Sequence, residues 1–176
     1  MALHSCVSGE YPIASSSELA SADVIVAQSF GTRQEGGSPG KVNSLLAEHA
    51  QKLAEYYDIP LIAQEEIADS LPESLVHTKV SGDPSSSDGS GLDSWGVLSK
   101  VREIRGDEAK PIIVAQAYHI GRVSLQAIKL GMDPRLPGDM PREFAPESDQ
   151  WWTRSRGLWV ARELSGMAVL KLQKKL

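Results

Sequence analysis

Cysteine is almost absent from this chain of 176 residues, since Cys6 is the only one. A single cysteine excludes an intrachain disulfide and a cysteine-based zinc site, and Cys6 is expected to be an inert thiol near a loose N-terminus. The histidines are also few and scattered, without the spacing of metal ligands. They are His4, His49, His77 and His119. We therefore expect no metal site.

Long hydrophobic runs are missing as well. No stretch approaches the roughly 18 consecutive apolar residues that indicate a membrane span. Residues 1–17 lack the charged region and the apolar core of a secretory signal. We therefore expect a soluble cytoplasmic protein.

A surplus of basic charge is also absent, because the formal net charge is −5. This balance argues against nucleic-acid binding, which requires a basic face for the phosphate backbone. It remains compatible with a local pocket for an anionic small molecule.

The chain does contain a regular alternation of short apolar runs and amphipathic helical patterns. Strands are predicted at residues 23–28, 58–64, 74–80 and 110–117, with a short fifth strand near residue 132. Helices are predicted at residues 42–57, 95–105 and 119–130, and from about residue 151 to the C-terminus. This pattern predicts an α/β domain over residues 22–176, with a mostly parallel sheet of about five strands covered by helices on both faces. Residues 1–21, rich in serine and alanine, precede it as an N-terminal extension.

The first candidate ligand-binding segment is the loop "SFGTRQEGGSPGK" at residues 29–41. In an open α/β sheet, ligands bind beyond the carboxyl ends of the strands, and the helix after this loop offers N–H groups to an anion. The loop contains neither G-x-G-x-x-G nor a Walker sequence. An ordinary strand–helix connection is the alternative, although such loops usually run about 2–6 residues. The predicted ligand-binding residues are Gly31, Arg33, Gly40, Lys41 and Asn43.

The second candidate is "AYHIGR", in which His119 and Arg122 lie three residues apart at a helix start and can share a face. Arg122 offers a fork of donors to phosphate or carboxylate, and His119 can donate a hydrogen bond or transfer a proton near neutral pH. An isolated His-x-x-Arg is more often a surface pair. Its position after the most strand-like segment of the chain favours a site.

The third candidate is "SDGSGLDSWG" at residues 87–96, a polar loop that leads into a helix. Asp93 and Ser94 are predicted to reach the same crevice, and a flexible surface loop is the alternative. No convincing nucleophile accompanies these groups, because no G-x-S-x-G turn is present. Glu65 and Glu66 are interpreted as the solvated start of a helix.

Tryptophan is concentrated in the C-terminal region, where Trp159 is predicted to lie in the core. The adjacent Trp151 and Trp152 cannot both face inward from a helix. One of them is therefore a candidate for covering a cleft or for forming an oligomer interface.

The order of these features resembles the SanA/YdcF/ElyC-like family, a bacterial group of domains of unknown function with a Rossmann-like three-layer α/β/α fold. The matching segments are "ADVIVAQSFG", "LLAEHAQKLAEYYDIPLIAQ", "PIIVAQAYHIGRVSLQAIKLG" and "RSRGLWVARELSG". The resemblance is to a divergent member, because "AQEEIADS" stands where the family usually has a double glycine. It implies a pocket beside His119 and Arg122, with S-adenosylmethionine or a nucleotide as candidate ligand, and a link to the cell envelope.

Taken together, the residues and the resemblance predict an enzyme-like protein that binds an anionic or nucleotide-like small molecule at the edge of the sheet. His119 would be the catalytic residue of a hydrolysis or a group transfer. A non-catalytic binding or regulatory module with the same pocket is the alternative, which the missing nucleophile favours. A scaffold that uses its tryptophans and basic tail as a partner surface is a third hypothesis.

Overall fold

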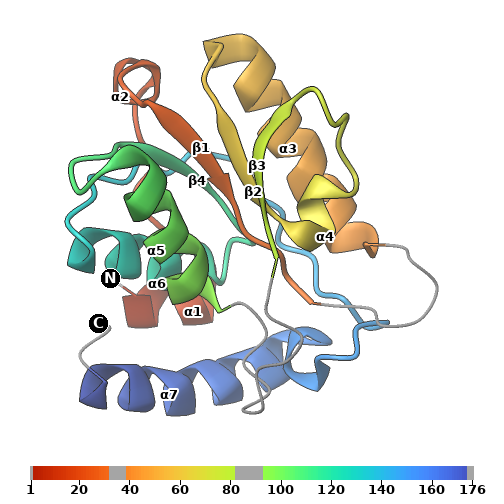
Figure 1. The fold of residues 1–176 in the computed structure, drawn as a ribbon. Helices are drawn as coiled ribbons and strands as arrows, with labels where there is room; N and C mark the ends of the chain where they lie inside the picture. Colours follow the sequence, from red (N-terminus) through yellow and green to blue (C-terminus); the bar gives the residue numbers. More distant parts are fainter. Residues whose placement is uncertain (1, 32–38, 82–92, 174–176) are drawn as a thin grey trace.

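Four short strands form one parallel sheet in the computed structural model, which describes residues 2–31, 39–81 and 93–173 (Figure 1). The strand order is β3-β2-β1-β4. The second and third strands are therefore added on one side of β1, and the fourth is added on its other side. The strands are β1 (Val24–Ala27), β2 (Leu61–Gln64), β3 (Val76–Val80) and β4 (Pro111–Val114). The predicted α/β fold with a parallel sheet is confirmed.

Helices cover both faces of this sheet. The helix α3 (Lys41–Tyr57) packs against β1, and α5 (Ser94–Arg105) packs against α6 (Ile120–Lys129). Parallel strands are joined by right-handed crossovers, so a connection that reverses direction along the sheet places its helix on the opposite face. Figure 1 shows this arrangement, with α3 on one side of the sheet and α5 and α6 on the other. The fold is therefore Rossmann-like.

The strands β1 and β4 are buried along their whole length, as expected for a parallel sheet with both faces covered. Their near-continuous runs "VIVA" and "PIIV" place the apolar side chains in one core with α3, α5 and α6. Local signals set the helix boundaries. Asp93 accepts a hydrogen bond from the Gly96 N–H (2.7 Å) at the start of α5, and Gly106 ends that helix at φ +91°.

The predicted fifth strand does not form. Among the described residues, the segment after α6 makes a single parallel bridge, between Ile112 and Arg135. The Arg135 N–H donates to Pro111 O (2.8 Å) and the Ile113 N–H donates to Arg135 O (2.9 Å). Pro137 stands where the next N–H toward β4 would be and has none, so the regular pairing ends at Arg135.

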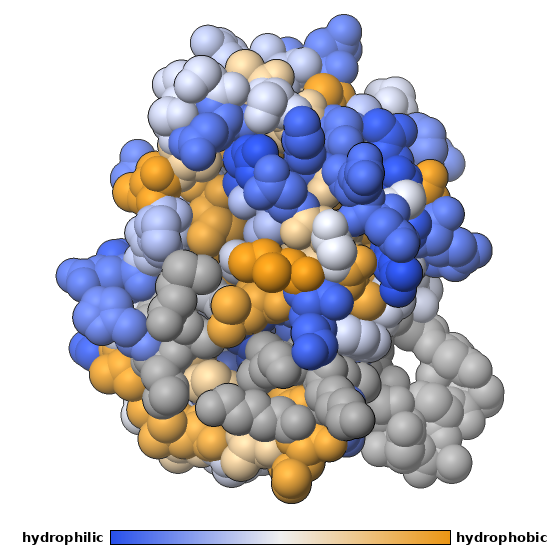
Figure 2. Space-filling view, turned by 90° about the vertical axis from the view of Figure 1, so that its left-hand side faces the viewer, coloured by the Kyte–Doolittle hydropathy of each residue, from blue (hydrophilic) through white to orange (hydrophobic). Residues whose placement is uncertain are grey.

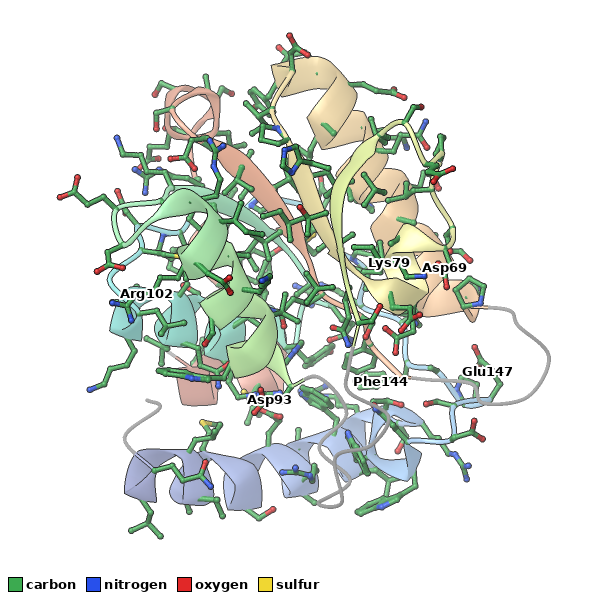
Figure 3. All side chains as sticks on the ribbon, viewed as in Figure 1. Asp69, Lys79, Asp93, Arg102, Phe144 and Glu147 are labelled. Atoms are coloured by element: carbon green, nitrogen blue, oxygen red, sulfur yellow. The ribbon has the colours of Figure 1, made fainter. Side chains whose placement is uncertain are left out.

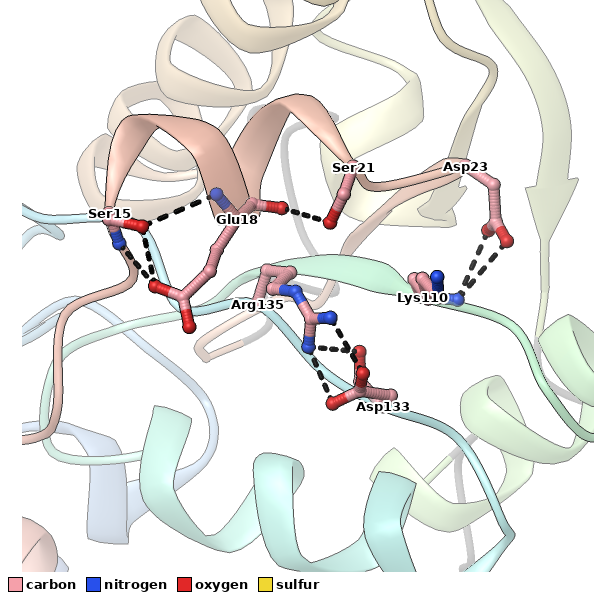
Figure 4. Close-up of polar contacts among 7 residues, drawn as sticks. All are labelled: Ser15, Glu18, Ser21, Asp23, Lys110, Asp133 and Arg135. Carbon is pink, nitrogen blue, oxygen red and sulfur yellow. Dashed lines mark hydrogen bonds and ion pairs between the residues drawn. The ribbon is translucent and has the colours of Figure 1, made fainter.

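The segment before β1 is fastened to the domain. The helix α1 (Ala2–Ser8) packs against α6 and α7, and Cys6 within it is buried, so the expected loose terminus is instead a docked helix. The short helix α2 (Ser16–Ala20) begins with a capping box, in which Ser15 and Glu18 satisfy each other's backbone N–H groups (Figure 4). Residues 2–21 are thus part of the packed structure.

The C-terminal part of the chain closes the end of the sheet where the strands finish. A 3₁₀ turn, η1 (Trp151–Thr153), leads into α7 (Arg156–Leu172), which lies across that end in Figure 1. Trp159, Glu163 and Met167 face the body of the protein and are buried. The remaining short helix, α4 (Glu65–Ala68), follows β2 directly.

The outer side of α7 carries several exposed apolar side chains. Figure 2 shows hydrophobic residues gathered at the lower end of the molecule, where this helix lies. Trp151 is half exposed, whereas Trp152 packs partly buried against the core, so the two adjacent tryptophans do point in different directions. The exposed apolar side chains of the helix are Leu158, Leu164, Val169 and Leu172. An oligomer formed through this region stays a prediction.

No helix in the described parts of the chain combines the length and the apolar character that crossing a membrane requires.

Candidate functional site

The strand order reverses between β1 and β4, and the two segments that leave these strands diverge there. In open α/β sheets this point is where a crevice forms beyond the carboxyl ends. The segment after β1 is Gln28–Gly31, and the segment after β4 is Ala115–His119. The Gln28 N–H still donates to Val114 O (2.9 Å), so the two segments separate only beyond that point.

His119 stands at this point as the first residue of a buried polar chain. Its Nε2 lies 3.1 Å from Ser94 Oγ, at the start of α5, and its Nδ1 lies 3.1 Å from Arg122 Nη2, one turn along α6. The Arg122 Nε donates to Glu163 Oε2 (2.8 Å) on α7. The Cys6 thiol donates to that same oxygen (3.6 Å) from α1. Three predicted site residues, His119, Arg122 and Ser94, are therefore brought together.

Arg122 determines which ring nitrogen of His119 carries the proton. A guanidinium only donates hydrogen bonds, so Nδ1 of His119 must accept, and the ring proton resides on Nε2. Burial and the neighbouring Arg122 charge hold the pKa of His119 well below its ordinary value. The neutral ring consequently donates to Ser94 Oγ. It lacks the free nitrogen lone pair that activating the Ser94 hydroxyl as a nucleophile would require.

The arginine itself is paired with a carboxylate. The side chain of Arg122 is 15% exposed and that of Glu163 is 4% exposed, so their charges compensate each other in a largely water-free position. Burial, and then the charge of Glu163, raise the pKa of Cys6 to about 12. The thiol is therefore protonated at neutral pH, in agreement with its expected inertness.

Aromatic rings pack beside these buried polar side chains, where α7 meets the body of the protein. The ring centroids of His119 and Trp159 are 5.3 Å apart, and those of Phe30 and Trp159 are 4.8 Å apart. The Trp159 indole N–H donates to Tyr118 O (3.3 Å). Trp159 thus packs in the core, as the sequence predicted, and brings α7 against the segments that leave β1 and β4.

Asn43 organises the loop that enters α3. Its Oδ1 accepts from the Phe30 N–H (2.7 Å), and its Nδ2 donates to Gly31 O (3.0 Å) and to Pro39 O (2.8 Å). The amide therefore clamps both described ends of the loop, and this internal use differs from the predicted ligand contact. Arg33 falls in 32–38, outside the described residues.

The two predicted glycines of the loop have positive φ angles, +83° at Gly31 and +79° at Gly40. A Cβ at Gly31 would lie 2.8 Å from Ser148 Oγ, so the glycine allows the C-terminal segment to approach closely. At the start of α3 the Lys41 N–H donates to a carboxylate oxygen of Glu147 (3.4 Å), and Figure 3 shows Glu147 in that region. The Lys41 side chain is exposed.

Three glutamines at strand ends were missed by sequence reasoning. Gln28, Gln64 and Gln116 follow alanine at the ends of β1, β2 and β4, and the repeated Ala-Gln was the available signal. Gln64 Oε1 accepts from the Ser29 N–H (3.2 Å), while Gln116 binds the Tyr118 N–H (2.8 Å) and Glu143 O (3.1 Å). They fix the segments that leave the strands.

Gln28 differs from the other two. It is 1% exposed and donates Nε2 to Ser94 O (3.4 Å), which joins it to the group that contains His119. Its Oε1 is buried and has no hydrogen-bond partner among the described residues. A buried acceptor without a partner is rare in proteins, because it costs about 1–3 kcal/mol of stability.

A second unsatisfied acceptor lies at the end of β2. Glu66 is half-buried, and its Oε2 is buried without a hydrogen-bond partner in the described parts of the chain. Burial raises the pKa of Glu66, while hydrogen bonds from its own backbone and from the Ser29 side chain act in the opposite direction. Glu65 pairs with Lys79 (3.3 Å) instead. Glu65 and Glu66 do begin α4, as predicted, but Glu66 is half-buried and not fully solvated.

Within the described residues, no group of three or more histidine, cysteine or acidic side chains is placed to hold a metal ion. Comparison with family models, curated proteins and solved structures gave no match to this chain. The fold and site define a Rossmann-like α/β protein with buried polar groups at the carboxyl edge of its sheet. The SanA/YdcF/ElyC-like resemblance stays a prediction.

Proposed function

We propose that this chain binds a nucleotide-like small molecule at the carboxyl edge of its sheet, between the ends of β1 and β4. The observation that carries the proposal is the unpartnered Oε1 of Gln28, which lies beside Ser94 at the point where the strand order reverses. A ligand N–H or O–H at this acceptor would remove the cost of leaving it unsatisfied.

The anionic part of such a ligand would bind at the start of α3. Backbone N–H groups and the positive end of the helix dipole favour negative charge there, and the carboxylate of Glu147 already contacts the Lys41 N–H. Gly40 and Lys41 are at the start of α3, and Asn43 ties Gly31 to the same loop, whereas Asp93 and Ser94 are at the start of α5. A phosphate would take the place of the Glu147 carboxylate.

Arg122 would then act as a positioning residue and would not contact the anion directly. It orients His119, which in turn orients Ser94, and Glu163 neutralises its charge. Because the proton of His119 points at Ser94, the arrangement favours a binding or regulatory module over a hydrolase or transferase that uses these two residues. S-adenosylmethionine is a second candidate ligand, since it combines ribose hydroxyls with an ammonium donor.

Titration of isotope-labelled protein with ATP, AMP and S-adenosylmethionine tests the proposal. We expect at least one of them to shift the backbone amide signals of Ser29, Gly31 and Ser94. Gln28→Leu should weaken that binding by about tenfold, the value of one hydrogen bond. Gln126→Leu is the matched control, because Gln126 is equally buried but lies in α6. Absence of binding by all three compounds, or unchanged binding by a folded Gln28→Leu variant, would overturn the proposal.

A further inference from the structure

We propose that α7 binds the surface of an anionic lipid bilayer through its outer face, lying flat on the membrane without crossing it. This inference goes beyond the proposed function and does not depend on it. It assigns a partner to the hydrophobic residues at the lower end of the molecule in Figure 2.

The two sides of α7 are set by the helical period. Trp159, Glu163 and Met167 recur every four residues and are buried against the body of the protein. On the opposite side, residues recur at intervals of three and four and are all exposed. This outer face consists of Leu158, Ala161, Ser165, Ala168, Val169 and Leu172. The helix is therefore held by one face and offers the other along its whole length.

The outer face can enter an apolar surface at little cost in hydrogen bonding. Its only polar side chain is Ser165, whose hydroxyl donates to Arg162 O (2.9 Å) within the same helix. The backbone groups of the helix are bonded to each other, as any segment that enters lipid requires. Trp151, which is half exposed, stands in the 3₁₀ turn before the helix and is a residue type that favours the membrane–water interface.

Basic charge accompanies this apolar face, although the chain as a whole is acidic. From residue 151 to the C-terminus the sequence contains six lysines and arginines and a single acidic residue, Glu163. The carboxylate of Glu163 is buried and paired with Arg122, so it does not contribute to the outer surface. Such an asymmetry of charge along a chain is typical of proteins that bind nucleic acids or membranes.

The exposed arginines of this region keep their charge available. Arg154 donates its Nε to a backbone carbonyl (2.7 Å), and Arg156 does the same (3.1 Å). The guanidinium of Arg162 lies 5.6 Å from the centre of the Trp152 ring. None of these partners carries a charge, so each arginine can still attract an anionic group.

An anionic bilayer matches both properties at once. A helix with an apolar face and basic residues beside it binds in the plane of the membrane, with its apolar side chains among the acyl chains and its cations at the headgroups. A second copy of this chain would bring two basic surfaces together, and a nucleic acid would leave the leucines in water. The acidic remainder of the protein opposes binding only weakly, because charges are screened beyond about 8 Å at physiological ionic strength.

Co-sedimentation of the full chain with phosphatidylcholine vesicles, prepared with and without phosphatidylglycerol, tests the proposal. We expect the protein to partition about tenfold more strongly onto the vesicles that contain phosphatidylglycerol, and added salt should reduce this difference. Arg162→Gln should weaken binding to the anionic vesicles about fivefold, the value of one cation at such a surface. Lys129→Gln removes the same charge from α6 and should leave the partition unchanged.

The apolar contribution is tested by Val169→Asp, with Ile128→Asp as the matched control. Both side chains are β-branched, 51% exposed and close to the C-terminal end of a helix, but Ile128 belongs to α6. Val169→Asp should weaken binding to the anionic vesicles by about tenfold, because it removes an apolar group and adds a charge that the lipids repel. Ile128→Asp should have no effect. Urea unfolding of both variants shows that they remain folded.

Three results would overturn the proposal. One is an absence of binding to either kind of vesicle, and another is an equal loss of binding in Val169→Asp and Ile128→Asp. The third is a wild-type protein that light scattering shows to be a dimer, together with a monomeric Val169→Asp variant. That last result would assign the outer face of α7 to a second copy of the chain.

Discussion

Three buried glutamines differ in how far their side-chain amides are satisfied. Gln116 has partners for both ends of its amide, and Gln28 has a partner for Nε2 alone. Gln126, inside α6, has none for either end among the described residues. Gln28 lies where a ligand is proposed, whereas Gln126 packs inside a helix layer. The same residue type therefore has three different energetic roles in one domain.

The first prediction concerns this difference. Gln126→Leu should raise the free energy of unfolding by about 1–2 kcal/mol, because it replaces an unsatisfied buried amide with an apolar group of similar size. Gln116→Leu should lower it by about 1–3 kcal/mol, because it leaves the Tyr118 N–H and Glu143 O without partners. Urea unfolding of both variants measures the effect. A loss of stability in both would contradict the interpretation of Gln126.

At the scale of residues, the sequence predicts which side chains lie close together better than it predicts what each side chain does. The three-residue spacing of His119 and Arg122 indicates a shared face, and their side chains do meet at 3.1 Å. Glu163 lies 41 residues further along and reaches Arg122 only because α7 crosses the end of the sheet. No local pattern encodes that crossing. The arginine therefore resembled a free anion ligand in the sequence.

At the scale of elements, α7 is joined to α6 by one buried ion pair. Glu163→Ala would leave the guanidinium of Arg122 buried and unpaired, and we expect a loss of about 3–5 kcal/mol in the free energy of unfolding. The control is Glu48→Ala, which breaks the exposed pair with Lys52 (2.6 Å) and should cost less than about 1 kcal/mol.

The double variant Arg122→Leu, Glu163→Leu sharpens this test. Replacing both members of a buried pair by apolar residues is often neutral, so the double variant should be more stable than Glu163→Ala. Equal losses in the exposed and the buried pair would show that α7 is held by packing alone.

The elements themselves were largely predictable, and the failures have physical causes. Continuous apolar runs identified β1 and β4, and helical periodicity identified α3 and α6. The fifth strand was wrong because the segment forms a single bridge, at Arg135, and Pro137 has no N–H to extend it. The helix α1 was not predicted, because a segment of seven residues carries too little periodicity and is stabilised by contacts with distant helices.

At the scale of the whole molecule, His119 couples stability to pH. Its pKa is lowered in the folded state, so below about pH 6.5 the unfolded chain binds a proton that the folded protein does not. The free energy of unfolding should therefore fall as the pH drops below this value, by up to about 1.4 kcal/mol per pH unit from this group. Above it, both states are neutral at His119 and the effect disappears.

Urea unfolding at about pH 7.5 and about pH 5.5 measures this dependence, with His119→Gln as the comparison. The difference in free energy of unfolding between the two proteins reports on His119 alone, because other titrating groups are common to both. One of these is Glu66, whose raised pKa makes the folded state more stable on acidification. The stability advantage of the wild-type protein should shrink on acidification. Parallel pH curves for the two proteins would exclude a role for His119.

The contact between Cys6 and Glu163 has a consequence for the synthesis of the protein. The two residues are separated by 157 positions, so a ribosome working at about 5–20 residues per second leaves an interval of roughly 8–30 seconds between them. During that interval α7 is not yet available, so the side chains of α1 that it covers in the native protein stay uncovered. Exposed apolar surface favours aggregation, so we expect chaperone binding during this interval to raise the yield of native protein.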